Sequence, residues 1–330
     1  MLKIPRALGT LVCIGALLLG SACSAGSGGS SGGGQPGQLS VVTSFYPLQF
    51  LAERIAGPHA AVENLTPAGS EPHDLELTPK QVGSLGQADL LVYERTFQAA
   101  VDQAVDNAGD VPSLDTTTVV PLEKTGADHD HEGEDGEGHE GEGHEGEGHE
   151  GDGHDHGEND PHVWLDPTRM VTIAEALTAQ LKQLDADHAD DYDANLTTLR
   201  SELTTLDKEF SSGLADCDRT EFITSHAAFG YLAKRYHLAQ IGISGLSPDA
   251  EPSPARIAEI HAEAEEHGIT TIFYETLVSP DVAKSIAGDL GLRTDVLDPL
   301  EGITDQSKGE DYLAVMRSNL AALQTANGCQ

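Results

Sequence analysis

The chain has 330 residues, of which 38% are hydrophobic and 22% charged, and its formal net charge is −37. This length and apolar content suffice for one large hydrophobic core or two ordinary ones. So large an excess of acidic side chains argues against nucleic acid and anionic membrane surfaces as partners, and it is compatible with attracting cations.

Residues 1–22 are predicted to be a targeting segment that takes no part in the fold. Lys3 and Arg6 precede an apolar stretch, Ala7 to Gly20, which is shorter than the roughly 20 residues of a membrane-spanning helix. Small residues then lead to Cys23, and a Gly/Ser-rich linker runs to residue 38. This pattern is typical of a bacterial lipoprotein lipidated on Cys23, and predicts an extracytoplasmic protein anchored to the cell membrane. An ordinary secretory signal is the alternative.

From Leu39 onward, predicted strands alternate with predicted helices. Strands are expected at 39–44, 60–65, 88–93 and 116–120, and helices at 47–56, 78–87 and 97–108. Strands that alternate with helices of about ten residues predict βαβ units and a parallel sheet. This pattern defines an N-terminal lobe, residues 39–187.

A low-complexity acidic loop, residues 128–159, interrupts this lobe. From Asp128 to Asp160 the chain has fifteen Asp or Glu and no Lys or Arg. The loop also carries seven histidines, four of them spaced five residues apart: His129, His131, His139, His144, His149, His154 and His156. Weak accessory metal binding by these side chains is expected. The loop could collect metal for a tighter site, or it could be a solvated spacer.

Two helical stretches follow the acidic loop. Residues 167–184 have their apolar side chains on one face, and residues 188–215 carry an unbroken apolar stripe with alternating spacings of four and three. The second stretch is expected to form one long helix, about 40 Å at 1.5 Å per residue. It would connect the N-terminal lobe to a C-terminal lobe, residues 216–330.

The C-terminal lobe repeats the alternation of strands and helices. Strands are expected at 221–225, 238–243, 269–275 and 294–298, and helices at 226–237, 254–268, 280–291 and 309–326. Four helix starts place a capping side chain before a proline: Thr78-Pro79, Asp166-Pro167, Ser253-Pro254 and Ser279-Pro280. The predicted fold is therefore α/β, with two lobes of mostly parallel sheet joined by one long rigid helix. Ligands of such sheets bind outside the carboxyl ends of the strands, which places the site in the cleft between the lobes.

Two cysteines remain beyond the targeting segment and Cys23. An exported chain with two such cysteines, Cys217 and Cys329, most simply forms one disulfide. The bridge would tie the C-terminal end to the middle of the chain. Two free buried thiols are the alternative.

Three histidines outside the acidic loop lie where a strand-end loop leads into a helix. His73 precedes the Thr78 cap, His162 precedes the Asp166 cap, and His226 directly follows a predicted strand, beside Ser225 as an expected cap. A neutral imidazole in such a place can bind a divalent cation. Three of them, distributed over both lobes, favour a metal site over three unrelated structural histidines.

A fourth ligand is expected from the C-terminal lobe. Asp298, at the end of the last predicted strand, is the first choice, although it could be only a turn former; Glu301 is the alternative. Glu275 could be a ligand or could accept a ring N–H from a ligand histidine. Three imidazoles and one carboxylate suit Zn²⁺ better than Mn²⁺, Mg²⁺ or Ca²⁺, which favour oxygen.

Four motifs, EPHDLEL, DPHVWLDP, SHAAFGYL and LDPLEG, resemble in order and spacing those of the zinc-binding (ZnuA-like) lipoproteins of ATP-binding-cassette metal importers. The resemblance covers Leu39 to Gln330. It implies that His73, His162 and His226 are metal ligands, and that Asp298 matches a position where many members place a carboxylate. It further implies a monomer that captures Zn²⁺ and delivers it to a membrane permease driven by an ATPase.

Two other classes of function stay open at this point. A zinc-dependent hydrolase would use three histidines and an open coordination position, with Glu275 as general base. Against it, the chain has no H-E-x-x-H motif, and a fourth protein ligand would close the open position. A metal-sequestering or adhesive surface lipoprotein would carry the same lipid anchor.

Overall fold

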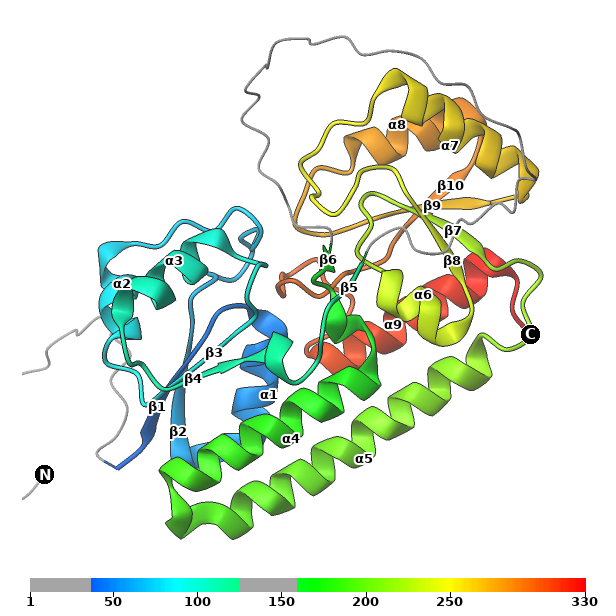
Figure 1. The fold of residues 1–330 in the computed structure, drawn as a ribbon. Coiled ribbons are helices and arrows are strands. Elements are labelled where there is room, and N and C mark those ends of the chain that lie inside the picture. Colours follow the sequence, from blue (N-terminus) through cyan, green and yellow to red (C-terminus); the bar gives the residue numbers. More distant parts are fainter. Residues whose placement is uncertain (1–36, 125–158) are drawn as a thin grey trace, which may run out of the picture. The chain divides into compact units, whose positions relative to one another are not determined.

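The computed structural model describes residues 37–124 and 159–330, which contain two four-stranded parallel sheets and the helices that cover them (Figure 1). The predicted targeting segment, Cys23, most of the linker and the seven histidines of the acidic loop lie outside the described residues. Within the described ranges, no helix is long and apolar enough to cross a membrane.

The N-terminal sheet has the strand order β2-β1-β3-β4, and all neighbouring strands are parallel. Its elements are β1 (Leu39–Thr43), α1 (Tyr46–Ala56), β2 (Ala60–Asn64), α2 (Pro79–Leu85), β3 (Leu90–Tyr93), α3 (Ala99–Ala108) and β4 (Ser113–Asp115). Along β3, Leu90 and Val92 join one buried cluster, whereas Leu91 and Tyr93 join another. Because successive side chains point to opposite faces, the sheet is covered on both sides, as parallel sheets require.

The last strand of this sheet lies earlier than predicted. The expected strand 116–120 begins instead as a 3-10 helix, Thr116–Thr118, and β4 precedes it. The Asp115 carboxylate accepts hydrogen bonds from Thr117 N at 3.0 Å and from Thr117 Oγ1 at 2.8 Å. This local turn overrides the strand preference of the β-branched run, so the prediction for 116–120 was wrong.

Two long helices, α4 (Pro167–Leu184) and α5 (Ala189–Gly213), lie side by side and lead from the first sheet to the second (Figure 1). The apolar stripe predicted for the second helix is buried at Tyr192, Leu199, Leu203, Leu206 and Phe210. This helix, α5, packs against α4, α1 and α9 (Tyr312–Asn327). Its 25 residues span about 37 Å at 1.5 Å per residue.

The C-terminal sheet has the order β10-β9-β7-β8, again with all neighbours parallel. Besides α9, its elements are β7 (Glu221–Thr224), α6 (Gly230–Tyr236), β8 (Ala239–Gly242), α7 (Pro254–Glu266), β9 (Thr271–Tyr274), α8 (Asp281–Leu290) and β10 (Arg293–Val296). The predicted α/β architecture with two parallel sheets is therefore confirmed.

Three of the four predicted helix caps are present. The side chains of Thr78, Asp166 and Ser253 each accept a backbone N–H of the first turn. The fourth of these helices, α8, begins one residue later than expected, at Asp281, whose N–H donates to Ser279 Oγ at 3.3 Å.

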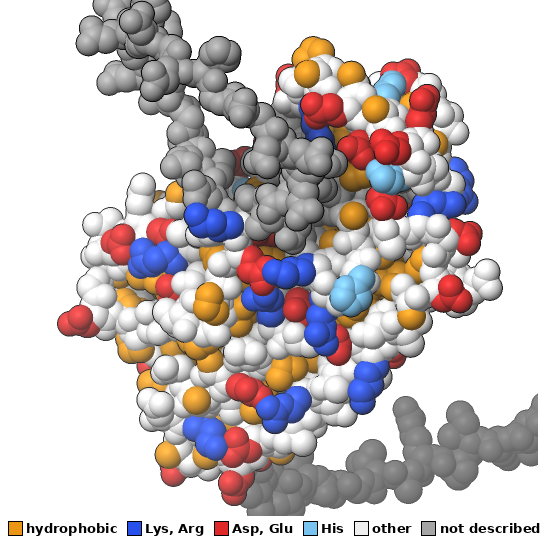
Figure 2. Space-filling model, turned by 45° about the vertical axis from the view of Figure 1, so that its right-hand side comes forward, with side chains coloured by type: hydrophobic (Ala, Val, Ile, Leu, Met, Phe, Trp, Pro, Cys, Tyr) orange, Lys and Arg blue, Asp and Glu red, His pale blue; other side chains and the backbone are white. Residues whose placement is uncertain are grey.

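On the face shown in Figure 2, acidic and basic side chains are interspersed rather than separated into patches.

A disulfide and a short ladder, both outside the two four-stranded sheets, join residues that are far apart in the chain. Cys217 and Cys329 form the expected disulfide across a sequence separation of 112 residues. A two-stranded antiparallel ladder joins β5 (Glu123–Lys124) to β6 (Asn159–Asp160), the two residue pairs that flank the segment 125–158. The Tyr231 hydroxyl of α6 accepts from Glu123 N at 2.7 Å and donates to Asp160 O at 2.9 Å. One side chain thus secures both strands of the ladder.

Candidate metal centre

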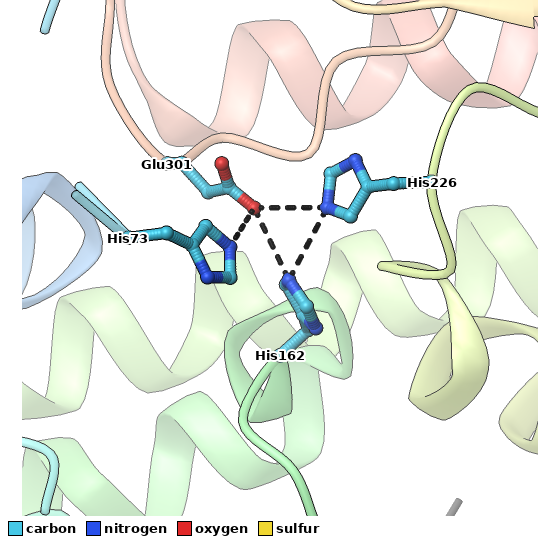
Figure 3. A group of neighbouring side chains, drawn as sticks. All are labelled: His73, His162, His226 and Glu301. Carbon is cyan, nitrogen blue, oxygen red and sulfur yellow. Dashed lines mark hydrogen bonds and ion pairs between the residues drawn. The ribbon is translucent and has the colours of Figure 1, made fainter. Parts of the chain in front are cut away.

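Four potential ligands, His73, His162, His226 and Glu301, converge from four separate segments (Figure 3). His73 lies in the segment after β2, His162 just after β6, His226 after β7 and Glu301 after β10. One candidate ligand atom of each lies within 4.8 Å of all the others. The side chains of His162, His226 and Glu301 are buried, and that of His73 is nearly so, at 6% exposure.

The spacing of the histidine nitrogens around Glu301 Oε1 is that of a zinc site. Glu301 Oε1 lies 3.1 Å from His162 Nε2, 3.3 Å from His226 Nε2 and 3.4 Å from His73 Nε2. The Nε2 atoms of His162 and His226 are 3.4 Å apart. With metal–ligand bonds of about 2.0–2.1 Å, the ligand atoms of a tetrahedral Zn²⁺ lie about 3.3–3.4 Å from one another. Four of the six spacings among the ligand atoms match this geometry, and His73 Nε2 lies within 4.8 Å of the other two imidazole nitrogens.

A carboxylate orients each of the two buried histidines. His162 Nδ1 lies 2.7 Å from Asp160 Oδ1, and His226 Nδ1 lies 2.8 Å from Glu275 Oε1. A hydrogen bond at Nδ1 fixes the ring and leaves Nε2 available to a metal, as in many zinc sites. Glu275 thus makes the ring contact considered for it in the sequence. Asp160 was not singled out, although it opens the DPHVWLDP motif.

Ser225 has a different role from the one expected. It was expected to cap a helix beginning at residue 226, but its hydroxyl donates to Glu275 Oε1 at 2.8 Å. Helix α6 begins only at Gly230. The intervening turns place His226 among the ligands instead of on a helix.

The structure does not bring Asp298 to the histidines. Its carboxylate accepts from Leu300 N at 2.8 Å, from Ser307 Oγ at 2.9 Å and from Thr276 Oγ1 at 3.2 Å. The resulting turn holds Leu300 at a φ of 61° and directs Glu301, the alternative of the sequence analysis, to the three rings. Both carboxylates were visible in the sequence, but the direction of this turn was not.

The charges of the site depend on one another. Burial alone would raise the pKa of Glu301, but the three neighbouring imidazoles hold that pKa well below its usual range. Burial alone would lower the pKa of His162 and of His226, yet the adjacent carboxylates raise both. The Glu301 carboxylate is therefore ionised, and a bound metal ion would replace the protons that these rings attract.

Glu71 is a further carboxyl group beside the site, and it was not singled out from the sequence. Its Oε1 accepts from His73 N at 3.1 Å, in the EPHDLEL motif. Burial, followed by the charge of Glu301, raises the pKa of Glu71 to about 9. The raised pKa favours the neutral form of this carboxyl group in the metal-free site, where Glu71 positions the His73 backbone.

Comparison with known proteins connects this geometry to one family. The family model ZnuA, "Zinc-uptake complex component A periplasmic", matches residues 41–326. The chain belongs to the ZnuA family. The family resemblance of the four sequence motifs is thereby confirmed.

Two curated relatives and one solved structure show how far the similarity to ZnuA-family proteins extends. The high-affinity zinc uptake system protein ZnuA of Bacillus subtilis is 35% identical over 321 residues, 96% of each chain. The zinc-binding lipoprotein AdcA of Streptococcus pneumoniae is 38% identical over 303 residues, 87% of this chain and 56% of AdcA, so the chain spans about half the length of that relative. The crystal structure of the Zn(II)-bound ZnuA-like domain of Streptococcus pneumoniae AdcA matches with a TM-score of 0.70 at 33% identity, over 88% of this chain and 99% of that domain.

Proposed function

We propose that this chain captures Zn²⁺ outside the cytoplasm and delivers it to the permease of an ATP-binding-cassette importer, with His73, His162, His226 and Glu301 as ligands. The observation that carries the proposal is the buried set of three imidazole nitrogens around one carboxylate oxygen, which lies within 3.4 Å of each of them. A nitrogen-rich tetrahedral set suits Zn²⁺, whereas Mg²⁺ and Ca²⁺ require more oxygen ligands. Membership of the ZnuA family supports the delivery step.

The geometry favours capture over hydrolysis. Catalytic zinc sites use three protein ligands and keep a fourth position open for water or substrate. Here Glu301 Oε1 stands at the fourth position, within 3.4 Å of all three histidines. Glu275, the candidate general base, accepts at Oε1 from Ser225 Oγ and lies with the same oxygen 2.8 Å from His226 Nδ1. It is therefore an orienting acceptor in this arrangement.

The lipid anchor on Cys23 and weak accessory binding by the acidic loop are further parts of the proposal. Both rest on the sequence, because these residues lie outside the described ranges. Metabolic labelling with a radioactive fatty acid tests the anchor. The wild-type chain should incorporate label and the Cys23→Ser variant should not; equal labelling of both would reject the anchor.

Zinc titration against a competing fluorescent chelator tests the main site. The metal-free wild-type chain should bind one Zn²⁺ tightly, and His226→Ala should lose that ion. His59→Ala is the matched control, because His59 pairs with Asp191 and lies outside the ligand set. Absence of tight binding to the wild type, or equal binding by His226→Ala, would reject the site.

Delivery needs a separate measurement in the host cell. A strain that lacks the gene should grow poorly under zinc chelation and take up radioactive zinc slowly. The wild-type gene should restore both properties, and His226→Ala should not. Tight binding in vitro without any change in uptake would instead indicate a lipoprotein that only sequesters metal.

A further inference from the structure

A buried hydrogen bond links the segment that carries His162 to the segment that carries Glu301, and each bonded residue is two positions from its ligand in the sequence. Trp164 Nε1 donates to Pro299 O at 2.7 Å, and both residues are buried. Trp164 follows His162 by two residues, and Pro299 precedes Glu301 by two. The same two segments are also joined by the 3.1 Å contact between His162 Nε2 and Glu301 Oε1.

The indole is itself firmly held. The ring of Trp164 is 1% exposed and packs against Phe45 and Phe97, with centroid distances of 4.8 Å and 5.3 Å. Its centroid lies 5.1 Å from that of His162. The backbone carbonyl of Trp164 accepts from the Tyr312 hydroxyl of α9 at 2.6 Å. Both the side chain and the backbone of Trp164 are thus bonded to segments that follow the C-terminal sheet.

The segment that carries Glu301 depends on such support. Leu300 is fully buried at a φ of 61°, a conformation that a branched side chain holds only when its surroundings impose it. Asn319 fixes the start of the segment, accepting from Asp298 N at 2.9 Å and donating to Asp298 O at 2.7 Å. Proline has no N–H, so the carbonyl is the only backbone hydrogen-bonding group of Pro299. The indole of Trp164 holds that group.

We infer that Trp164 is a positioning residue for the bound metal, because its indole N–H sets the place of Glu301 relative to His162. This inference rests on the proposed function as a zinc-capturing protein. Without the N–H, the metal-free segment can shift until Pro299 O finds another donor. In the zinc complex the segment cannot make this shift, since Glu301 has to stay bound to the metal. The substitution should therefore weaken zinc binding more than it destabilises the metal-free fold.

Trp164→Phe tests the inference, because it removes the N–H and keeps an aromatic ring in the cluster. Zinc affinity should fall about 10–100-fold, the usual effect of losing a group that supports a metal ligand, mainly through faster dissociation into excess chelator. Tyr192→Phe is the matched control: it removes a buried aromatic donor, bonded to Asp185 at 2.7 Å, on a different part of the chain. It should leave both zinc affinity and dissociation unchanged.

Co²⁺ as a probe separates positioning from a purely structural role. The visible absorption bands of the Co²⁺-loaded chain should change in Trp164→Phe and stay unchanged in Tyr192→Phe. Unaltered bands and zinc affinity in Trp164→Phe, with only a lower resistance to urea in the metal-free state, would overturn the inference. A wild type without tight zinc binding would reject the proposed function instead.

A second variant keeps the test decisive if Trp164→Phe does not fold. Trp164 is the one tryptophan of the chain, so it can be replaced biosynthetically by benzothienylalanine, which has a sulfur atom in place of the indole N–H and keeps the size of the ring. Zinc should leave this variant several-fold faster than it leaves the wild type, and an unchanged rate would overturn the inference.

Discussion

Two conservative substitutions, Glu301→Gln and Asp298→Asn, separate the carboxylate that lies among the histidines from the one that shapes its loop. Each replaces a buried carboxylate by an amide of nearly the same size. Glu301 Oε1 contacts all three histidines, whereas the Asp298 carboxylate accepts from Leu300, Thr276 and Ser307. Both substitutions should weaken zinc binding, but by different amounts.

The larger loss is expected for Glu301→Gln. Glu301 is fully buried, so its removal leaves a buried divalent cation less well compensated, and breaking a buried ion pair costs about 3–5 kcal/mol. The amide oxygen can still bind the metal as a neutral ligand, so the expected loss of binding free energy is about 3 kcal/mol, which is about 150-fold in affinity. Asp298→Asn keeps every ligand and disturbs only their support, so about tenfold is expected.

Chelator-competition titrations at fixed pH and ionic strength measure both losses, with unfolding of the metal-free variants followed in parallel. The wild type and His59→Ala serve as references. A loss in Asp298→Asn that equals or exceeds the loss in Glu301→Gln would refute the assignment of Glu301 as the ligand. It would favour Asp298, the first choice from the sequence.

The remaining predictions concern the disulfide, metal linkage and the acidic loop. Replacing Cys217 and Cys329 by alanine should lower the free energy of unfolding of the metal-free chain by up to about 5 kcal/mol for a 112-residue loop in urea titrations, without changing zinc affinity; an unchanged midpoint would contradict this. Free zinc at 100 times the Kd should add about 2.7 kcal/mol to that free energy, and a chelator should remove it; a melting temperature insensitive to zinc would argue against a site confined to the folded state. Deletion of residues 128–158 should leave the one tight ion in calorimetric titrations and abolish the weaker ones, and equal stoichiometry in both chains would reject accessory binding.

The alternation of apolar strands and amphipathic helices made the two parallel sheets predictable. The regular stripe from Tyr192 to Phe210 likewise predicted the long helix, because each of its spacings brings the next side chain to the same face. His73 and His162 could be located because a capping side chain and a proline mark the helix start that follows each of them. His226 could be located because it follows the strand β7. These features are local in the chain, which is why the sequence shows them.

Three aspartates whose local role was not foreseen from the sequence share one kind of contact. Asp115 accepts the N–H of Thr117, and Asp298 accepts that of Leu300, so each aspartate bonds to the backbone two residues ahead. The same contact joins Asp160 to His162, and its role was also missed. An aspartate that bends its own backbone has the same sequence signature as one that ends a strand or binds a metal. Only the three-dimensional course of the chain distinguishes them.

The ladder between β5 and β6 has a practical consequence for protein engineering. Glu123 pairs with Asp160 and Lys124 with Asn159, so the two ends of the segment 125–158 are held next to each other. Lengthening a loop between fixed ends costs little entropy, about 0.6 kcal/mol for each doubling. The stretch between Lys124 and Asn159 is therefore a suitable position for inserting a fluorescent domain. Because the next turn carries His162, such a fusion could report metal occupancy while the body of the protein stays intact.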